Sequence, residues 1–223
     1  MSKSDHVPAV SMPTGLSIGY SDRLAQVGEE DGDIVLEGGT HYLLARNGRG
    51  KTTLLRTLAG VLHPLGGRYQ CSGHCQFLSE EIAFDRELPA KTIFKAMLSK
   101  PKYKEAIKLA RKLELDVDKY YGRLSTGNKR KVALLVAEFS IVDGRSNILL
   151  LDEPFTGLDA FAREIFQELW SNSHSSVLRL VSCHPDFDSM EMNSSVLITE
   201  GKIIHLRGGD VPKRWGELKV QLN

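Results

Sequence analysis

This chain of 223 residues lacks long apolar runs, an excess of one charge and the number of cysteines that a disulfide framework needs. No stretch approaches the roughly 18 consecutive apolar residues that a membrane-spanning helix needs. The formal net charge is only +1, so no strong field attracts nucleic acid, a membrane surface or an acidic substrate. Three cysteines form an odd and sparse set, which favours a reducing compartment over a disulfide framework.

What is present is the composition of an ordinary globular protein, with 41% hydrophobic and 26% charged residues. Residues 1–15 are polar and lack the apolar core of a secretory signal, so export of the chain is not expected. We expect these residues and the polar residues 210–223 to be tails that flank one domain at residues 16–209.

Strand and helix patterns alternate along the domain, which predicts an α/β fold with a mainly parallel sheet. A segment with helical patterns only, broken near Pro101, predicts a small inserted helical lobe at about residues 89–130. Hairpins are expected within residues 68–79 and at a turn formed by Glu200 and Gly201. The other expected strands are 15–20, 33–36, 41–44, 148–151 and 177–181, and the expected helices are 52–62, 91–98, 103–115, 160–170 and the segment after Ser125.

A cluster of potential metal ligands lies at residues 71–75, which read Cys-Ser-Gly-His-Cys. The ligands are crowded, and no second Cys/His pair follows at the spacing of a zinc finger. A hairpin that turns at Ser72 and Gly73 is therefore favoured over a zinc site.

Residues 148–159 read ILLLDEPFTGLD and carry the strongest single signal. Four apolar residues form a strand of the kind that is buried in a parallel sheet, and a proline ends it after two acids. Carboxylates at the carboxyl end of such a strand suit a magnesium ion and a water molecule beside a polyphosphate. Alone, the run could equally be a buried strand with a capping Asp.

Residues 45–53 read ARNGRGKTT and match the phosphate-loop pattern G-x-x-x-x-G-K-[ST], except that Ala45 replaces the first glycine. Backbone N–H groups at the start of the following helix would surround phosphate oxygens. Lys51 would provide a charge for the β- and γ-phosphates, and the Thr52 hydroxyl would bind magnesium. Ala45 is tolerable there if its φ is negative and costly if φ is positive. The expected nucleotide-binding residues of the loop are Ala45, Arg46, Asn47, Gly48, Arg49, Gly50, Lys51, Thr52 and Thr53.

Residues 124–131 read LSTGNKRK. By itself, this segment is explained by Ser125 as the cap of a helix. Between a phosphate loop and an Asp-Glu strand, it resembles the LSGGQ signature of ATP-binding-cassette (ABC) ATPases, with Thr126 and Asn128 where the family most often has Gly and Gln. The resemblance covers about residues 16–206 and implies the P-loop NTPase core of ABC type, with an antiparallel β subdomain and a small inserted helical subdomain.

The resemblance also implies roles for individual residues. Asp152 corresponds to the acid on the magnesium side, and Glu153 corresponds to the general base that orients the attacking water. His184 follows an apolar strand at the place of the switch histidine, against the γ-phosphate. Together with Lys51, it would stabilise the charge that develops during hydrolysis.

Three further assignments depend on position in the family pattern. Asp159 corresponds to the D-loop, which touches a partner subunit. Tyr20 is similar to the aromatic residue that stacks on adenine, although a half-buried strand tyrosine explains it equally well. Glu80 stands where the family has a glutamine near the magnesium ion and the membrane partner, and its carboxylate could also bind the metal. The side chains of Arg46 and Arg49 are expected to be exposed to solvent.

The family implies a cytoplasmic ATPase that uses ATP and Mg²⁺, works as a homodimer and lies on the inner face of a membrane through a permease partner. Ser125, Thr126 and Gly127 of one copy would then complete the ATP site of the other. An exporter motor is our first hypothesis. A soluble ABC ATPase acting on nucleic acid or the ribosome is a second, although no basic surface predicts a nucleic-acid partner. A regulatory module that does not hydrolyse ATP is a third, supported only by Ala45 and Glu80.

Overall fold

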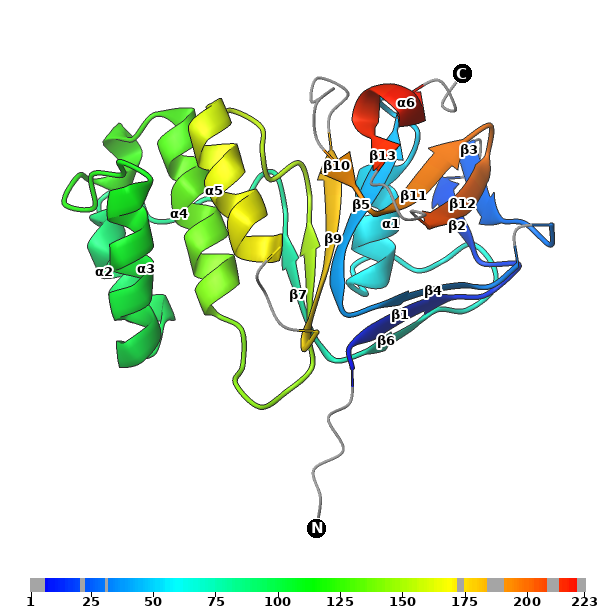
Figure 1. Cartoon of the computed structure of the whole chain (residues 1–223), viewed down its shortest axis with the longest axis horizontal. Coiled ribbons are helices and arrows are strands. Elements are labelled where there is room, and N and C mark those ends of the chain that lie inside the picture. Colours follow the sequence, from blue (N-terminus) through cyan, green and yellow to red (C-terminus); the bar gives the residue numbers. More distant parts are fainter. Residues whose placement is uncertain are drawn as a thin grey trace, which may run out of the picture. The chain divides into compact units, whose positions relative to one another are not determined.

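The computed structural model of the chain describes residues 7–20, 23–30, 32–171, 175–183, 191–207 and 213–219. The chain forms two compact units (Figure 1). The first comprises Met1–Phe77, Gly144–Glu153 and Ser173–Asn223, and the second comprises Leu78–Asp143 and Pro154–Asn172. The second unit extends beyond the helical lobe expected at residues 89–130, since helix α5 (Ala160–Ser171) also belongs to it.

The larger sheet has eight strands in the order β2-β3-β12-β11-β5-β9-β8-β7. Its central pairs β11–β5, β5–β9 and β9–β8 are parallel, while β2–β3 and β11–β12 are antiparallel. Every residue of β8 and β9 is buried, as expected of apolar strands at the centre of a parallel sheet. The strands are β2 (Ser17–Tyr20), β3 (Arg23–Val27), β5 (Gly39–Ala45), β7 (His74–Leu78), β8 (Asn147–Leu151), β9 (Val177–Cys183), β11 (Ser194–Thr199) and β12 (Lys202–Arg207).

A smaller antiparallel sheet of the first unit has the order β4-β1-β6, formed by β4 (Ile34–Glu37), β1 (Ala9–Met12) and β6 (Gln70–Ser72). Helix α1 (Lys51–Leu58) joins the two sheets, because Leu54, Leu55 and Leu58 share one apolar core with residues of both. Strand β1 lies within the tail expected at residues 1–15. That expectation was wrong for this segment, since Val10 and Met12 are fully buried.

The hairpin predicted within residues 68–79 is also wrong. Strands β6 and β7 are consecutive but belong to different sheets, with β6 paired to β1 and β7 beside β8. Gly73 lies between them, and a Cβ atom there would be 3.1 Å from the Ser146 carbonyl oxygen. The neighbouring His74 N–H donates to that oxygen at 2.8 Å. The chain therefore passes from one sheet to the other at Gly73, where the lack of a side chain avoids crowding against the Ser146 carbonyl.

Helix α1 is shorter than the predicted helix at 52–62. It ends at Leu58, and Gly60 follows with φ 74°. The N–H groups of Gly60 and Val61 return to the carbonyl groups of Thr57 and Arg56 at 2.9 Å, which is the usual closure of a helix by a glycine in the left-handed region. Apolar residues at helical spacing therefore continue beyond the end of α1, and Val61 among them is 62% exposed.

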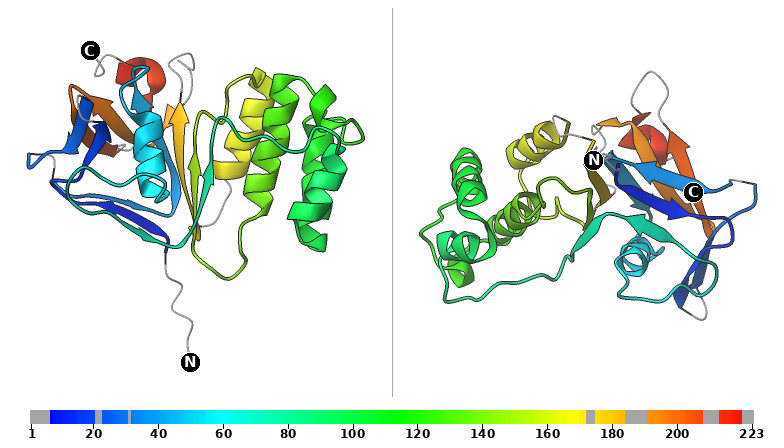
Figure 2. Two further views of the ribbon diagram at one scale, coloured as in Figure 1. Left: turned by 180° about the vertical axis from the view of Figure 1, so that it is seen from behind. Right: turned by 90° about the horizontal axis from the view of Figure 1, so that it is seen from below.

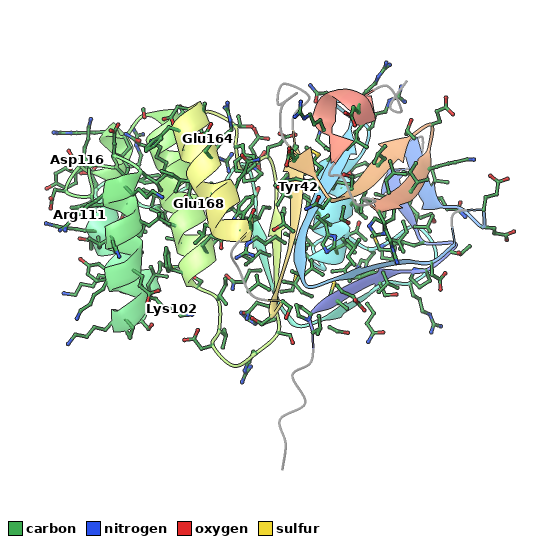
Figure 3. All side chains as sticks on the ribbon, in the orientation of Figure 1. Tyr42, Lys102, Arg111, Asp116, Glu164 and Glu168 are labelled. Atoms are coloured by element: carbon green, nitrogen blue, oxygen red, sulfur yellow. The ribbon has the colours of Figure 1, made fainter. Side chains whose placement is uncertain are left out.

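The second unit consists mainly of four helices that lie side by side (Figure 2). Pro101 lies in the first turn of α3 rather than at the break before it, a position where its missing N–H costs nothing. Trp170 Nε1 donates to the buried Glu138 carboxylate at 2.8 Å, and its ring stacks on Phe155 with centroids 5.2 Å apart. Charged side chains such as Arg111 and Glu164 cover the outside (Figure 3). The helices are α2 (Ala90–Met97), α3 (Lys100–Lys112), α4 (Thr126–Phe139) and α5, with the 3₁₀ turn η1 (Tyr121–Arg123) before α4.

Short elements near the C-terminus complete the first unit. Strand β10 (Glu191–Met192) pairs with β13 (Lys213–Arg214), and helix α6 (Trp215–Lys219) follows. The tail expected at residues 210–223 therefore contains a strand and a helix. Within the described ranges, none of the helices has both the length and the apolar character needed to cross a membrane.

Candidate functional site

The loop at residues 45–50 connects β5 to α1 at the carboxyl end of the parallel strands. Ala45 is the last residue of β5, fully buried and without positive φ, so the missing glycine causes no strain at that corner. Gly48 and Gly50 have φ 72° and 108°, conformations that favour glycine. The loop residues from Arg46 to Arg49 are exposed, which leaves the loop open to a ligand.

The start of α1 is suited to an anion. No side chain caps its N-terminus, and its first turn holds no acidic residue. The first N–H groups of a helix have no partner within the helix and carry a partial positive charge. By contrast, Ser125 caps α4 by accepting from the Asn128 N–H at 3.3 Å. The exposed glycine loop and the uncapped helix together form a surface that phosphate oxygens can approach.

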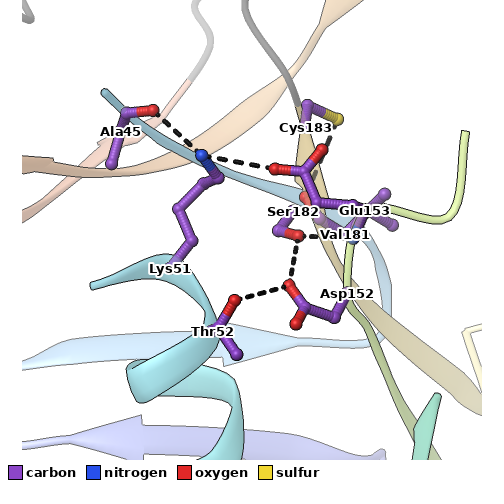
Figure 4. Close-up of polar contacts among 8 residues, drawn as sticks. All are labelled: Ala45, Lys51, Thr52, Asp152, Glu153, Val181, Ser182 and Cys183. Carbon is purple, nitrogen blue, oxygen red and sulfur yellow. Dashed lines mark hydrogen bonds and ion pairs between the residues drawn. The ribbon is translucent and has the colours of Figure 1, made fainter. Parts of the chain in front are cut away.

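Lys51 extends from the first residue of α1 toward the end of β8 (Figure 4). Its Nζ donates to the Ala45 carbonyl at 3.2 Å and forms an ion pair with Glu153 Oε1 at 3.3 Å. The two side chains are only 7% and 12% exposed. A buried ammonium and a nearly buried carboxylate so close together stabilise each other, and an incoming phosphate could compete for the ammonium.

Asp152 follows β8 and is 1% exposed. Its Oδ1 accepts hydrogen bonds from Thr52 Oγ1 at 3.2 Å and from Ser182 Oγ at 2.9 Å. Ser182 comes from the adjacent strand β9, which runs parallel to β8. Residues from α1, β8 and β9 therefore meet at one edge of the sheet, as expected where parallel strands end.

Glu153 has φ 46°, a left-handed conformation that is uncommon for a residue with a side chain and that is often found at functional sites. Its N–H donates to Ser182 Oγ at 2.7 Å. Burial, and after it the Glu153 carboxylate, raises the pKa of the neighbouring Cys183 thiol. The thiol therefore stays protonated at neutral pH and is no nucleophile.

The oxygen atoms of Thr52 and Asp152 fit a magnesium ion. Magnesium prefers hard oxygen ligands and is usually held by one or two protein groups, with water and substrate phosphates completing the shell. Across the described ranges, no group of three or more His, Cys, Asp and Glu side chains gathers as a metal cluster. A hydroxyl and one carboxylate nevertheless suffice where a polyphosphate provides further oxygens.

The signature segment belongs to the second unit, where Ser125 is the N-cap of α4 as expected. A Cβ atom at Gly127 would lie less than 3.0 Å from the carbonyl oxygen of Gly157, so this helix start is packed directly against the backbone of the loop after β8. Glycine is required there by the close approach of two backbones.

Asp159 connects the same loop to two helices of the second unit. Its Oδ1 accepts from the Ala162 N–H at 2.7 Å at the start of α5, and its Oδ2 pairs with Lys131 of α4 at 3.4 Å. The Ala162 hydrogen bond, with a contribution from the Lys131 ammonium, lowers the pKa of Asp159. Lys131 Nζ also donates to the Leu113 carbonyl at 2.9 Å.

The other predicted site residues have different outcomes. Tyr20 ends β2 and is 57% exposed; Ile18, two residues earlier, lies beside the phosphate loop, since a Cβ atom at Gly50 would be 3.9 Å from its Cδ1. Glu80 is exposed in the second unit, and its carbonyl accepts from Arg130 Nη2 at 3.1 Å. His184 lies outside the described residues.

Sequence reasoning missed Ser182, Arg130 and Lys131 as parts of these contacts. Ser182 was visible only as a polar residue at the end of an apolar strand. Arg130 and Lys131 lie inside the signature segment, where their exposed fractions of 8% and 7% are the opposite of what charged residues on a helix predict.

Comparison with known proteins identifies a family. The family described as ABC transporter matches residues 34–156. An uncharacterized ABC transporter ATP-binding protein of Methanocaldococcus jannaschii is 33% identical, covering 77% of this chain and 68% of that protein. The aliphatic sulfonates import ATP-binding protein of Granulibacter bethesdensis is 30% identical, covering 77% and 73%.

A solved structure has the same fold. The bacterial Atm1-family ABC exporter with ATP bound superposes with a TM-score of 0.71 at 16% identity, covering 96% of this chain and 40% of the other. At that identity the likeness establishes the fold alone. The family match and the two relatives go further: the chain belongs to the ABC transporter family of ATP-binding proteins, whose general activity is ATP hydrolysis.

Proposed function

We propose that this chain is the ATP-hydrolysing subunit of a transporter, that two copies close around two ATP molecules, and that the pair drives a separate membrane permease. The observation that carries the proposal is the meeting of Lys51, Thr52, Asp152 and Glu153 at the uncapped start of α1. The sulfonate import relative is named as an ATP-binding protein for transport, which supports the assignment to a transporter.

The ion pair between Lys51 and Glu153 suggests how the site changes when ATP binds. The phosphates would attract the Lys51 ammonium away from Glu153, because they carry more negative charge than one carboxylate. Glu153 would then be free to accept a hydrogen bond from the attacking water, as a general base must. A magnesium ion held by Thr52 and Asp152 would stabilise the charge on the phosphate oxygens.

The signature segment of the second unit would act on the ATP of the other copy. Ser125, Thr126 and Gly127 present the start of α4, whose N–H groups and dipole favour an anion. The Lys131–Asp159 ion pair links this helix to the loop proposed to touch the partner. His184 would contact the γ-phosphate, Tyr20 would stack on adenine, and Glu80 would lie near the metal.

Export is the direction that we propose, only because the LSTG form of the signature resembles that of bacterial exporter subunits. The relative from Granulibacter bethesdensis is named for import, and the exporter superposes at 16% identity, so the direction rests on neither. Identifying the membrane protein that co-purifies with the full chain tests both the partner and the direction. A permease of an import system would contradict export, and capture of no membrane protein would contradict the transporter role.

Glu153→Gln tests the dimer. The variant should bind ATP without hydrolysing it, since an amide cannot take the proton of the attacking water. We expect its mass by light scattering to rise with ATP and Mg²⁺ from 24.8 kDa to about twice that value. Glu164→Gln, the same change at an exposed site on α5, should stay monomeric and keep wild-type turnover. A Glu153→Gln variant that remains monomeric in saturating ATP and Mg²⁺ would contradict the dimer.

A further inference from the structure

Ser182 is a fully buried serine that bonds both acids of the site. Its Oγ donates to Asp152 Oδ1 at 2.9 Å and accepts from the Glu153 N–H at 2.7 Å. One hydroxyl therefore uses its single proton for the side chain of one acid and a lone pair for the backbone of the next. Figure 4 shows Ser182 beside the two acids.

The position of Ser182 follows from the register of two parallel strands. Leu151 of β8 is paired with Val181 of β9, so the next residue of β9 lies beside the point where β8 ends and the two acids begin. Asp152 and Glu153 continue beyond the strand, where the ladder no longer fixes the backbone. The hydrogen bonds of Ser182 replace the ladder at that point.

Each of the two hydrogen bonds restrains one of the acids on which hydrolysis would depend. Asp152 Oδ1 accepts from both Thr52 and Ser182, which fixes the rotation of the carboxylate and leaves Oδ2 as the oxygen that these hydroxyls do not use. Glu153 has φ 46°, a strained conformation that persists only where surrounding contacts hold it. Its bond to Ser182 is such a contact, and it fixes the direction in which the Glu153 side chain leaves the backbone.

We infer that Ser182 is a positioning residue for ATP hydrolysis, holding the metal-side carboxylate and the general base in their working geometry at the same time. This role rests on the proposed function of Asp152 and Glu153. In this role Ser182 acts through Asp152 and Glu153, and not by binding substrate or moving a proton. Its removal should therefore affect turnover and the response to magnesium much more than the affinity for the nucleotide itself.

Ser182→Ala tests the inference. We expect kcat to fall by about 10- to 100-fold, as is common when a group that orients a metal ligand is removed. Affinity for a fluorescent ATP analogue in EDTA should stay within about threefold of wild type, while the gain in affinity on adding Mg²⁺ should shrink several-fold. This second readout is independent of turnover and would not change if the serine only supported the fold. Ser182→Thr, which keeps the hydroxyl, should recover most of the loss.

Ser195→Ala is the matched control. Ser195 is a buried serine of β11 in the same sheet, 1% exposed, and its Oγ has no hydrogen-bond partner among the described residues. Removing this hydroxyl should leave kcat and magnesium response at wild-type values and should not lower thermal stability, since a buried hydroxyl without a partner is itself destabilising. If Ser182→Ala unfolds, Ser182→Thr and Ser182→Cys still test the inference. A thiol is a weak donor, so the kcat of Ser182→Cys should lie between that of Ser182→Thr and complete loss of activity.

The outcomes distinguish a failure of the role inferred for Ser182 from a failure of the proposed function. A wild-type chain that hydrolyses ATP, together with a Ser182→Ala variant that matches Ser195→Ala in kcat and magnesium response, would overturn the role of Ser182 alone. A wild-type chain with no turnover, with or without its co-purified membrane partner, would overturn the proposed function and this inference with it.

Discussion

Lys51→Ala is expected to lower affinity for ATP by about 10- to 100-fold, because a hydrogen bond to a charged group contributes about 1.5–3 kcal/mol and each 1.4 kcal/mol is a factor of ten. Turnover should fall further, by about 100- to 1000-fold, since Lys51 would also stabilise charge that develops in the transition state. Titration with a fluorescent ATP analogue and a steady-state ATPase assay measure the two effects separately.

The same substitution has a second effect that does not involve ATP. Lys51 neutralises the Glu153 carboxylate at 3.3 Å in a site where both side chains are nearly buried. Without the ammonium, Glu153 is left unpaired, and the free energy of unfolding should fall by about 1–3 kcal/mol. The double variant Lys51→Ala, Glu153→Gln should recover most of this stability in urea unfolding without nucleotide, but it should not recover ATP binding.

Lys202→Ala is the control for both readouts. Lys202 pairs with Glu30 at 3.4 Å, but its side chain is 57% exposed and that of Glu30 is 86% exposed. An exposed pair of this kind contributes about 0–1 kcal/mol, so stability and ATP binding should hardly change. If Lys51→Ala bound ATP as wild type does, residues 45–53 would not be the phosphate site.

Local signals predicted the elements whose geometry is decided by neighbouring residues. Ser125 caps α4 as expected. Glu200 and Gly201 form the predicted hairpin turn between β11 and β12, with φ 48° and 77°, the two positive values that a two-residue turn of this type requires. In both cases the residue type itself carries the conformational preference.

Prediction failed where distant segments decide the outcome. Nothing in residues 70–78 reveals that β6 joins β1 while β7 joins the larger sheet. Between the two strands Gly73 passes close to the Ser146 carbonyl, a contact between residues more than 70 positions apart that no local pattern reveals. The predicted end of α1 was also wrong, because Gly60 ends the helix although apolar residues at helical spacing continue to Leu62.

The residues of the candidate site also differ in whether local sequence could predict them. Lys51, Thr52, Asp152 and Glu153 could be chosen from sequence because their motifs have known spacing, and the structure brings these side chains together. Ser182 could not be chosen, since a serine at a strand end has no distinguishing pattern. Its role depends on the pairing of Leu151 with Val181, which is a property of the sheet and of no local segment.

Gly127→Ala is expected to disturb the signature helix through packing within one copy. The added Cβ would lie less than 3.0 Å from the Gly157 carbonyl oxygen, so either the first turn of α4 or the loop around Gly157 must move. The loop is held two residues later by Asp159, through Ala162 and Lys131, which limits its adjustment. Crowding of this kind costs about 1–3 kcal/mol, and Tm should fall by about 2–4 °C for each kcal/mol in a chain of this size.

Turnover should fall by about 100-fold in the same variant, because the signature segment is proposed to complete an active site and a displacement on the order of 1 Å at such a group has an effect of that size. Thr126→Ala provides the control for stability. Thr126 is exposed on the same turn of α4, so its truncation should change the free energy of unfolding by no more than about 0.5 kcal/mol.

Tm and turnover distinguish packing within one copy from the proposed contact with the ATP of the other copy. On the proposed function the chain is a single copy without nucleotide, so a lowered Tm under that condition reports the contact between Gly127 and Gly157 within one copy. A Gly127→Ala variant with wild-type Tm but without ATPase activity would show that the loop accommodates the methyl group and that the loss arises in the dimer. Wild-type values for both would contradict the close packing of these two glycines and the role of the signature segment together.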